Sequence, residues 1–283
     1  MRTLKGLVKL MRVELPVSAG ICVVMGQILA LGAIPSVLQM ALGFTSIFLI
    51  SASILVLNDY YDIETDKINA PHRPIPSGAV SPQGAFIWAV SLFLFGFSGG
   101  AFLSFQTLFL ALLVSVIGFL YNRKYKKSGL PGNLMVSFSV GMTFVYGGFS
   151  VGYPLEKTVW YFAVLAALID LGEEIAADAM DAKGDMIIRS KSLAIIYGRR
   201  PALNISGLIF TIVYLLSFLP FILGWFSLVY LIPVLIIDIS IVYSTVKLLK
   251  SSGDEGRKYI RTLYLGATLG ILVFVVMKAA GVQ

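Results

Sequence analysis

The sequence contains very little cysteine and few charged residues. Cys22 is the only cysteine among the 283 residues, which excludes a disulfide framework and a cysteine-based metal site. Charged residues make up 13% of the chain, whereas a soluble globular protein carries roughly a quarter. No polar stretch is long enough to form a second soluble domain. We therefore expect a single domain, residues 1–283, that lies mostly in lipid.

Hydrophobic residues make up 58% of the chain and are gathered in long runs. A helix needs about 20 predominantly apolar residues to cross a bilayer. By this criterion the chain is an all-α, polytopic membrane protein with about nine transmembrane helices. The predicted spans are residues 16–34, 37–57, 83–103, 105–121, 133–152, 157–175, 203–222, 225–246 and 260–280.

Basic residues are distributed very unevenly between the connecting segments. Of the 22 Lys and Arg residues, all but Lys157 and Lys278 lie on one side of the predicted membrane. By the positive-inside rule that side is the cytoplasm, so the chain is a cell-membrane protein with its N-terminus inside and its C-terminus outside. The net charge of +7 then reflects topology and attraction to lipid headgroups, and nucleic acid is not an expected partner. The segments on the cytoplasmic side are 1–15, 58–82, 121–132, 176–202 and 247–259. Arg261, at the start of the last predicted span, is counted with them.

Two clusters of acidic residues follow the second and sixth predicted spans. If the second helix continues past the membrane, Asn58, Asp62 and Asp66 share one face at i, i+4 and i+8. After the sixth span, a second stripe combines Glu174, Asp178, Asp181 and Asp185.

Like charges stacked on one helix face repel each other. A divalent cation would offset this repulsion, and oxygen ligands indicate Mg²⁺, Mn²⁺ or Ca²⁺ rather than zinc. Two such clusters facing each other would hold a diphosphate through metal bridges. The alternative interpretation is two solvated acidic helix ends.

Basic and aromatic residues accompany the acidic clusters. Arg73 lies in a loop, residues 69–78, that three prolines and a glycine make rigid, as suits a contact to phosphate. It is otherwise a topology-setting arginine. Tyr121, at the apolar boundary before Arg123 and Lys126, could stabilise a carbocation or anchor the chain at the interface. His72 is interpreted as a loop residue.

Asp238 lies inside the eighth predicted span, where a charge is expensive. No basic side chain or second carboxylate is found at the same depth. We expect Asp238 to be neutral or hydrogen-bonded within the helix bundle.

Five motifs occur in order along the chain, after the second, fourth and sixth predicted spans. They are Asn58-Asp59-x-x-Asp62-x-x-x-Asp66, Arg73-Pro74-Ile75-Pro76-Ser77-Gly78, Tyr121 with Lys126, Gly132-Asn133 and Asp178-x-x-Asp181-x-x-x-Asp185. Together they resemble the UbiA superfamily of intramembrane prenyltransferases. The resemblance covers nearly the whole chain.

This resemblance implies a helical bundle like that of soluble isoprenoid synthases, in which two Mg²⁺ ions bind a prenyl diphosphate. Asn58, Asp62 and Asp66 would serve one metal ion, and Asp178, Asp181 and Asp185 the other with help from Glu174. The diphosphate would be bound by Arg73, Lys126, Arg123 and Lys183. Tyr121, Asp66 and Asp185 are the expected catalytic residues.

One position departs from the family pattern. Family members often carry arginine where this chain has Glu173, and Lys183, Arg189 or Lys191 would have to substitute for it.

The expected reaction is prenyl transfer to a lipophilic acceptor. The loop from Asn69 to Gly78 is most similar to archaeal lipid-synthesis enzymes, which add a geranylgeranyl group to geranylgeranylglyceryl phosphate. An aromatic acceptor, such as a quinone precursor or a chlorophyll-type molecule, is the alternative. A lipid or ion transporter is the non-enzymatic alternative, but transporters bind ions near the bilayer midplane, whereas these carboxylates gather at one face.

Overall fold

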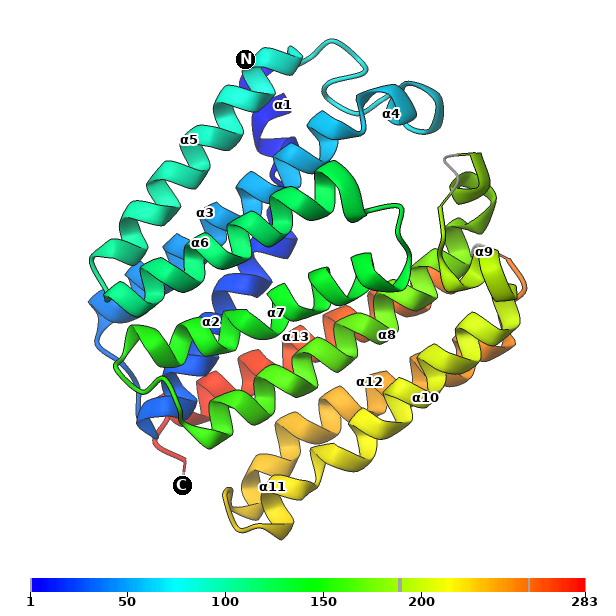
Figure 1. The fold of residues 1–283 in the computed structure, drawn as a ribbon. Coiled ribbons are helices and arrows are strands. Elements are labelled where there is room, and N and C mark those ends of the chain that lie inside the picture. The colour runs from blue at the N-terminus through cyan, green and yellow to red at the C-terminus, as the bar shows by residue number, and fades with distance from the viewer. Residues whose placement is uncertain (1, 188–189, 254, 283) are drawn as a thin grey trace. The chain divides into compact units, whose positions relative to one another are not determined.

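The structure is a computed structural model that describes residues 2–187, 190–253 and 255–282, without the side chains of residues 2, 69, 183–185 and 187. All regular elements in these ranges are helical, which confirms the predicted all-α class (Figure 1). Nine long helices in the same ranges correspond in order to the nine predicted spans. They are α2 (Glu14–Leu31), α3 (Val37–Tyr61), α5 (Pro82–Ala101), α6 (Phe105–Leu120), α7 (Leu130–Ser150), α8 (Lys157–Ile187), α10 (Arg199–Ser217), α12 (Leu231–Lys250) and α13 (Gly256–Ala279).

Seven of these helices are long and apolar enough to cross a membrane by themselves, so the chain is a multi-pass membrane protein. Within the described residues, α7 and α8 do not meet the same criterion. In α8 the apolar run is interrupted by Asp170, Glu173 and Glu174. These two helices therefore depend on packing against other helices more than on contact with lipid.

Two helices differ in extent from the predicted spans. α8 continues to Ile187, beyond the span end predicted at residue 175, as the stripe of carboxylates that reaches Asp185 requires. α12 begins at Leu231 instead of 225, because Gly224 adopts a left-handed φ of 67° that interrupts the chain direction. The short helices α11 (Leu219–Ile222) and η2 (Leu228–Tyr230) occupy this connection.

The chain divides into two compact units, and the first consists of Met1–Tyr125 and Met142–Glu156. In this unit α3 packs against α2 and α5 (Figure 1). Its apolar core includes Val56 of α3 together with Ile75 and Val80, which belong to the loop after α4 (Ile63–Asn69). The loop that carries Arg73 is therefore anchored in the core.

The second unit consists of Lys126–Gly141 and Lys157–Gln283. α10 packs against both α8 and α12, and α12 packs against α13 (Figure 1). The middle of α7 lies directly on α8: a Cβ added at Gly141 would be 2.7 Å from the carbonyl oxygen of Ala163. Only glycine permits such a close approach, which brings polar residues at the start of α7 beside the carboxylates of α8.

Candidate active site

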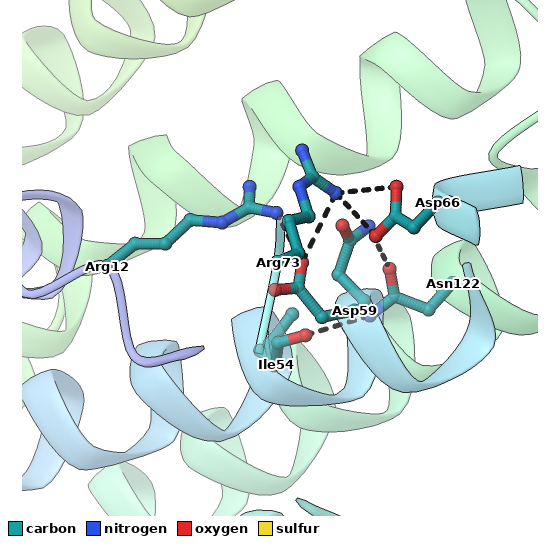
Figure 2. Close-up of polar contacts among 7 residues, drawn as sticks. Arg12, Ile54, Asp59, Asp66, Arg73 and Asn122 are labelled. Atoms are coloured by element: carbon teal, nitrogen blue, oxygen red, sulfur yellow. Dashed lines mark hydrogen bonds and ion pairs between the residues drawn. The ribbon is translucent and has the colours of Figure 1, made fainter. Parts of the chain in front are cut away.

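The first acidic cluster is built around Arg73 (Figure 2). Arg73 Nη1 donates to both oxygens of Asp66, at 2.9 and 2.7 Å, and lies 3.6 Å from Asp59 Oδ1. Arg12, at the start of the chain, forms an ion pair with the same oxygen of Asp59. Both carboxylates are almost fully buried, with 4% of Asp59 and 5% of Asp66 exposed. Such burial is tolerable because each carboxylate is paired with a guanidinium group.

The charge on Arg73 is secured by its surroundings. Burial by itself would lower the pKa of Arg73, but the hydrogen bond to Asp66 and the charges of Asp59, Asp66 and Asp62 raise it above the ordinary arginine value. The side chain therefore stays cationic at every physiological pH. A permanently charged guanidinium next to carboxylates is suited to bind phosphate oxygens.

The predicted stripe of Asn58, Asp62 and Asp66 spans the junction of two helices. α3 ends at Tyr61 and α4 begins at Ile63, with Asp62 between them. Helical hydrogen bonds continue across this junction: the Asp62 N–H donates to Asn58 O at 3.0 Å and the Asp66 N–H to Asp62 O at 2.8 Å. Asp66 shares its contact with Arg73 with the carboxylate of Asp59. Asp59 lies seven residues earlier and thus two helical turns away on the same face.

Asn58 is oriented by a second asparagine. Its Nδ2 donates to Asn122 Oδ1 at 2.9 Å. Asn122 Nδ2 in turn donates to the carbonyl oxygen of Ile54 at 3.0 Å (Figure 2). Asn122 belongs to η1 (Tyr121–Tyr125), a π-helical turn at the end of α6. Single π-helical turns are frequent at functional sites. In this turn the half-buried Tyr121 directly precedes Asn122.

The second acidic cluster lies along α8 and is supported by α7. Asn133 Nδ2 donates to Asp178 Oδ2 at 2.9 Å, and Ser137 Oγ donates to Asp170 Oδ2 at 2.9 Å. Asp181 forms an ion pair with Arg257 of α13. Burial raises the pKa of Asp178 above its ordinary value; the hydrogen bond from Asn133 lowers it and the charge of Asp181 raises it.

Two glutamates lie between these aspartates. Glu174 interacts electrostatically with Lys126, which belongs to the same unit. Glu173 Oε1 is buried and has no hydrogen-bond partner among the described residues. Glu173, at the position where family members often carry arginine, therefore leaves a buried carboxylate oxygen without a hydrogen-bond donor among the described residues.

The other residues that the sequence singled out lie at separate positions in the structure or outside the described residues. Arg123 is exposed, with its guanidinium 5.9 Å from the Phe119 ring. His72 is an exposed loop residue, as expected. Asp238 accepts a hydrogen bond from Ser217 at 2.8 Å, which confirms that it is hydrogen-bonded within the bundle. The side chains of Lys183 and Asp185, and the whole of Arg189, lie outside the described residues.

Several residues of these clusters were not predicted from the sequence. Asp170 extends the second stripe by one turn, and its position four residues before Glu174 could have identified it. Arg12 and Arg257 pair with residues 47 and 76 positions away. No local pattern identifies such long-range pairs.

The donor atoms of the two clusters fit magnesium. They are carboxylate and amide oxygens, the hard ligands that Mg²⁺ prefers. In the described ranges, no group of three or more His, Cys, Asp or Glu side chains is arranged to hold a metal ion. Mg²⁺ commonly takes one or two carboxylates and completes its coordination with water and phosphate oxygens. The residues therefore fit an ion that binds together with a phosphate-bearing ligand.

Comparison with known proteins identifies the family. The UbiA prenyltransferase family matches residues 19–279 of the chain. Digeranylgeranylglyceryl phosphate synthase of Pyrococcus abyssi is 30% identical over 276 residues, covering 97% of this chain and 98% of the relative.

Solved structures show the same fold. A structure described as giving insights into digeranylgeranylglyceryl phosphate synthase in membranes matches with a TM-score of 0.76 and 30% identity, covering 96% of this chain and 98% of the other. A UbiA homologue from Archaeoglobus fulgidus bound to GPP and Mg²⁺ has a TM-score of 0.69 and 15% identity, with coverage of 97% and 99%. At this lower identity the likeness concerns the fold alone. Because the family match extends over most of its length, the chain belongs to the UbiA prenyltransferase family.

Proposed function

We propose that this protein transfers a geranylgeranyl group from geranylgeranyl diphosphate to geranylgeranylglyceryl phosphate, in a Mg²⁺-dependent reaction of membrane-lipid synthesis. The observation that carries the proposal is the presence of two acidic clusters with basic partners in a chain of the UbiA family. The relative from Pyrococcus abyssi, matched over almost its full length, supports this choice of acceptor.

The proposal assigns one magnesium ion to each cluster. Asn58, Asp62 and Asp66 are the ligands assigned in the first cluster. In the second cluster the candidate ligands are Glu174, Asp178, Asp181 and Asp185, of which one or two would bind the ion directly. When bound, the ions supply positive charge that stabilises the departing diphosphate. The A. fulgidus homologue, bound to GPP and Mg²⁺, supports metal-dependent binding of a prenyl diphosphate in this fold.

The basic side chains bind and orient the diphosphate. Arg73 contributes a fixed cation, because the ion pairs with Asp59 and Asp66 hold its guanidinium in one place. Lys126, with Arg123 and Lys183 as further candidates, adds positive charge. These groups stabilise the negative charge that accumulates as the allylic carbon–oxygen bond breaks and its electron pair leaves with the diphosphate.

The organic part of the reaction needs an aromatic ring and a proton acceptor. Tyr121 would present its ring face to the allylic carbon, where positive charge develops. The acceptor hydroxyl oxygen then forms the new carbon–oxygen bond and loses its proton to Asp66, Asp185 or the departing diphosphate. The apolar walls of the long helices keep water from the allylic cation.

The proposal includes an orientation in the membrane. Both acidic clusters and their basic neighbours belong to the side that the positive-inside rule places in the cytoplasm. The N-terminus is then cytoplasmic and the C-terminus outside.

The test is a prenyl-transfer assay with purified full-length protein and radiolabelled geranylgeranyl diphosphate. Geranylgeranylglyceryl phosphate and an aromatic quinone precursor are offered in parallel, with Mg²⁺ or with EDTA. We expect product from the phospholipid precursor only, and none with EDTA. Product from the aromatic acceptor alone would replace the proposed acceptor. Mg²⁺-independent transfer would remove the metal from the proposal.

A further inference from the structure

Arg12 has an unusual backbone conformation between α1 (Arg2–Leu10) and α2. Its φ of 47° makes it the one non-glycine residue with a positive φ in the described part of the chain. A left-handed conformation is unfavourable for a residue with a side chain, so the surrounding structure must hold it there. The conformation directs the Arg12 guanidinium to Asp59, at the cytoplasmic end of α3 in the proposed topology (Figure 2).

Arg12, Asp59, Arg73 and Asp66 form a continuous ion-pair chain (Figure 2). Asp59 Oδ1 contacts Arg12 and lies 3.6 Å from Arg73 Nη1, whereas Arg73 lies closer to Asp66, at 2.7 Å. Asp59 is thus shared by two guanidinium groups, but Arg12 is the nearer one. As long as Arg12 compensates Asp59, Arg73 is directed toward Asp66.

α1 also packs on the loop that carries Arg73. A Cβ added at Gly6 would be 2.6 Å from Val80 Cγ2, and Leu10 is fully buried in the cluster that contains Ile75 and Val80. The loop is closed by hydrogen bonds from the Ser77 N–H to Arg73 O and from the Val80 N–H to Pro74 O, both 3.0 Å. The segment before the first span therefore contacts the Arg73 loop through apolar packing as well as through charge.

We propose that Arg12 is a positioning residue: by neutralising Asp59 it keeps Arg73 oriented toward Asp66 and available to the diphosphate. This inference rests on the proposed function of Arg73. Without Arg12, the buried charge of Asp59 has Arg73 as its remaining partner, because an uncompensated buried carboxylate is highly unfavourable. Arg73 would move toward Asp59 and away from Asp66.

The sharpest test combines Arg12→Asn with Asp59→Asn. Asparagine tolerates a positive φ, so Arg12→Asn removes the ion pair with little backbone strain. We expect about a tenfold rise in the KM for geranylgeranyl diphosphate, the size expected when one charge-assisted hydrogen bond is lost, with the KM of the acceptor unchanged. In the double variant the buried charge is gone, so the KM should return to within about threefold of the wild-type value. A double variant as impaired as Arg12→Asn, or more impaired, would overturn the proposal.

Two further variants separate positioning from general effects. Lys9→Ala removes an exposed positive charge from α1, three residues before Arg12, and should leave the KM unchanged. Arg12→Lys retains a charge for Asp59 and should recover part of the loss. If Lys9→Ala raises the KM as much as Arg12→Asn does, the effect is one of overall basic charge and the proposal fails.

Hydrogen exchange gives a readout that does not depend on activity. In Arg12→Asn without Mg²⁺ or substrate, the Ser77 amide should exchange faster than in the wild type, while amides in the middle of α5 should not change. Unchanged exchange at Ser77 combined with a raised KM would mean that Arg12 contacts the diphosphate directly, which contradicts the proposal. If the wild-type protein transfers no prenyl group, the proposed function fails, but the exchange measurement still decides whether Arg12 positions the loop.

Discussion

Asn133 of α7 donates a hydrogen bond from its side-chain amide to Asp178 of α8, at 2.9 Å. Among the described contacts of Asp178, this bond opposes two effects, burial and the nearby charge of Asp181, that raise the pKa of its carboxyl group. Asn133 therefore favours the ionised form of a residue that is proposed to bind Mg²⁺.

Replacing Asn133 by Ala should change the pH dependence of the reaction. The pKa of Asp178 is already raised, and loss of the hydrogen bond raises it further. Because Mg²⁺ binds the ionised carboxylate, activity is lost as the pH falls through this pKa, and the acidic limb of the profile should move to higher pH. The measurement is kcat/KM against pH at subsaturating Mg²⁺.

Ser139→Ala is the matched control for this prediction. Ser139 lies on the same helix, and its hydroxyl donates to Met135 O at 2.8 Å, a bond within α7. Its pH profile should match that of the wild type. An unchanged profile for Asn133→Ala would mean that Asp178 does not titrate in the reaction.

Asp62→Ala and Asp181→Ala should each abolish prenyl transfer while leaving the protein folded and extractable in detergent. Each variant removes one carboxylate from a different cluster, and the diphosphate charge is then left without sufficient compensation. The measurement is single-turnover rate at saturating Mg²⁺. Glu64→Ala, which removes an exposed carboxylate paired with Lys67, should retain near wild-type activity. Wild-type turnover in either aspartate variant would show that its side chain is not a ligand.

Arg73→Ala and Tyr121→Leu should affect different parameters. In the proposed mechanism Arg73 interacts with the diphosphate both before and during bond cleavage, so affinity and rate should both fall, together by about tenfold to a few hundredfold. The role proposed for the Tyr121 ring begins only when positive charge develops, so turnover should fall with little change in affinity. Direct titration with geranylgeranyl diphosphate and single-turnover rates separate the two. Loss of affinity without loss of rate in Tyr121→Leu would reduce the tyrosine to an interfacial or packing residue.

The proposed topology is tested by cysteine labelling. In a Cys22→Ser background, cysteines introduced at Lys157 and Ser252 should react from opposite sides of the membrane. A membrane-impermeant maleimide applied to intact cells should label the Lys157 position only, because the proposed topology places residue 252 in a cytoplasmic segment. Labelling of both positions from outside would contradict the orientation proposed for the acidic clusters.

Periodicity and composition predicted the helices well, and the site less completely. The nine apolar runs correspond to nine helices of the described ranges, because the bilayer sets the length of a span. The stripe along α8 was also within reach of the sequence, and the same spacing extends to Asp170. At the first cluster, however, the i, i+4 pattern did not select Asp59, whose carboxylate forms the ion pairs with Arg12 and Arg73.

The basic partners were the least predictable part. Arg73 was identified because prolines fix its loop, but the ion pairs of Arg12 and Arg257 join segments that are distant in sequence. Whether two such side chains meet depends on how the helices pack, and neither spacing nor composition contains that information. In the sequence, Arg12 is one of many basic residues on the predicted cytoplasmic side. Only the structure shows its contact with Asp59.

The interrupted apolar run of α8 has a consequence for how the protein enters the membrane. Between Lys157 and Asp170 the helix has a stretch, residues 158–169, of roughly 18 Å, whereas the hydrocarbon core of a bilayer is roughly 30 Å thick. A segment this short is a poor substrate for insertion by itself, and Glu173 and Glu174 add to the cost. The helix that carries the second acidic cluster should therefore become stable in the bilayer only once helices such as α10 pack against it. Its insertion thus depends on helices that are synthesised after it.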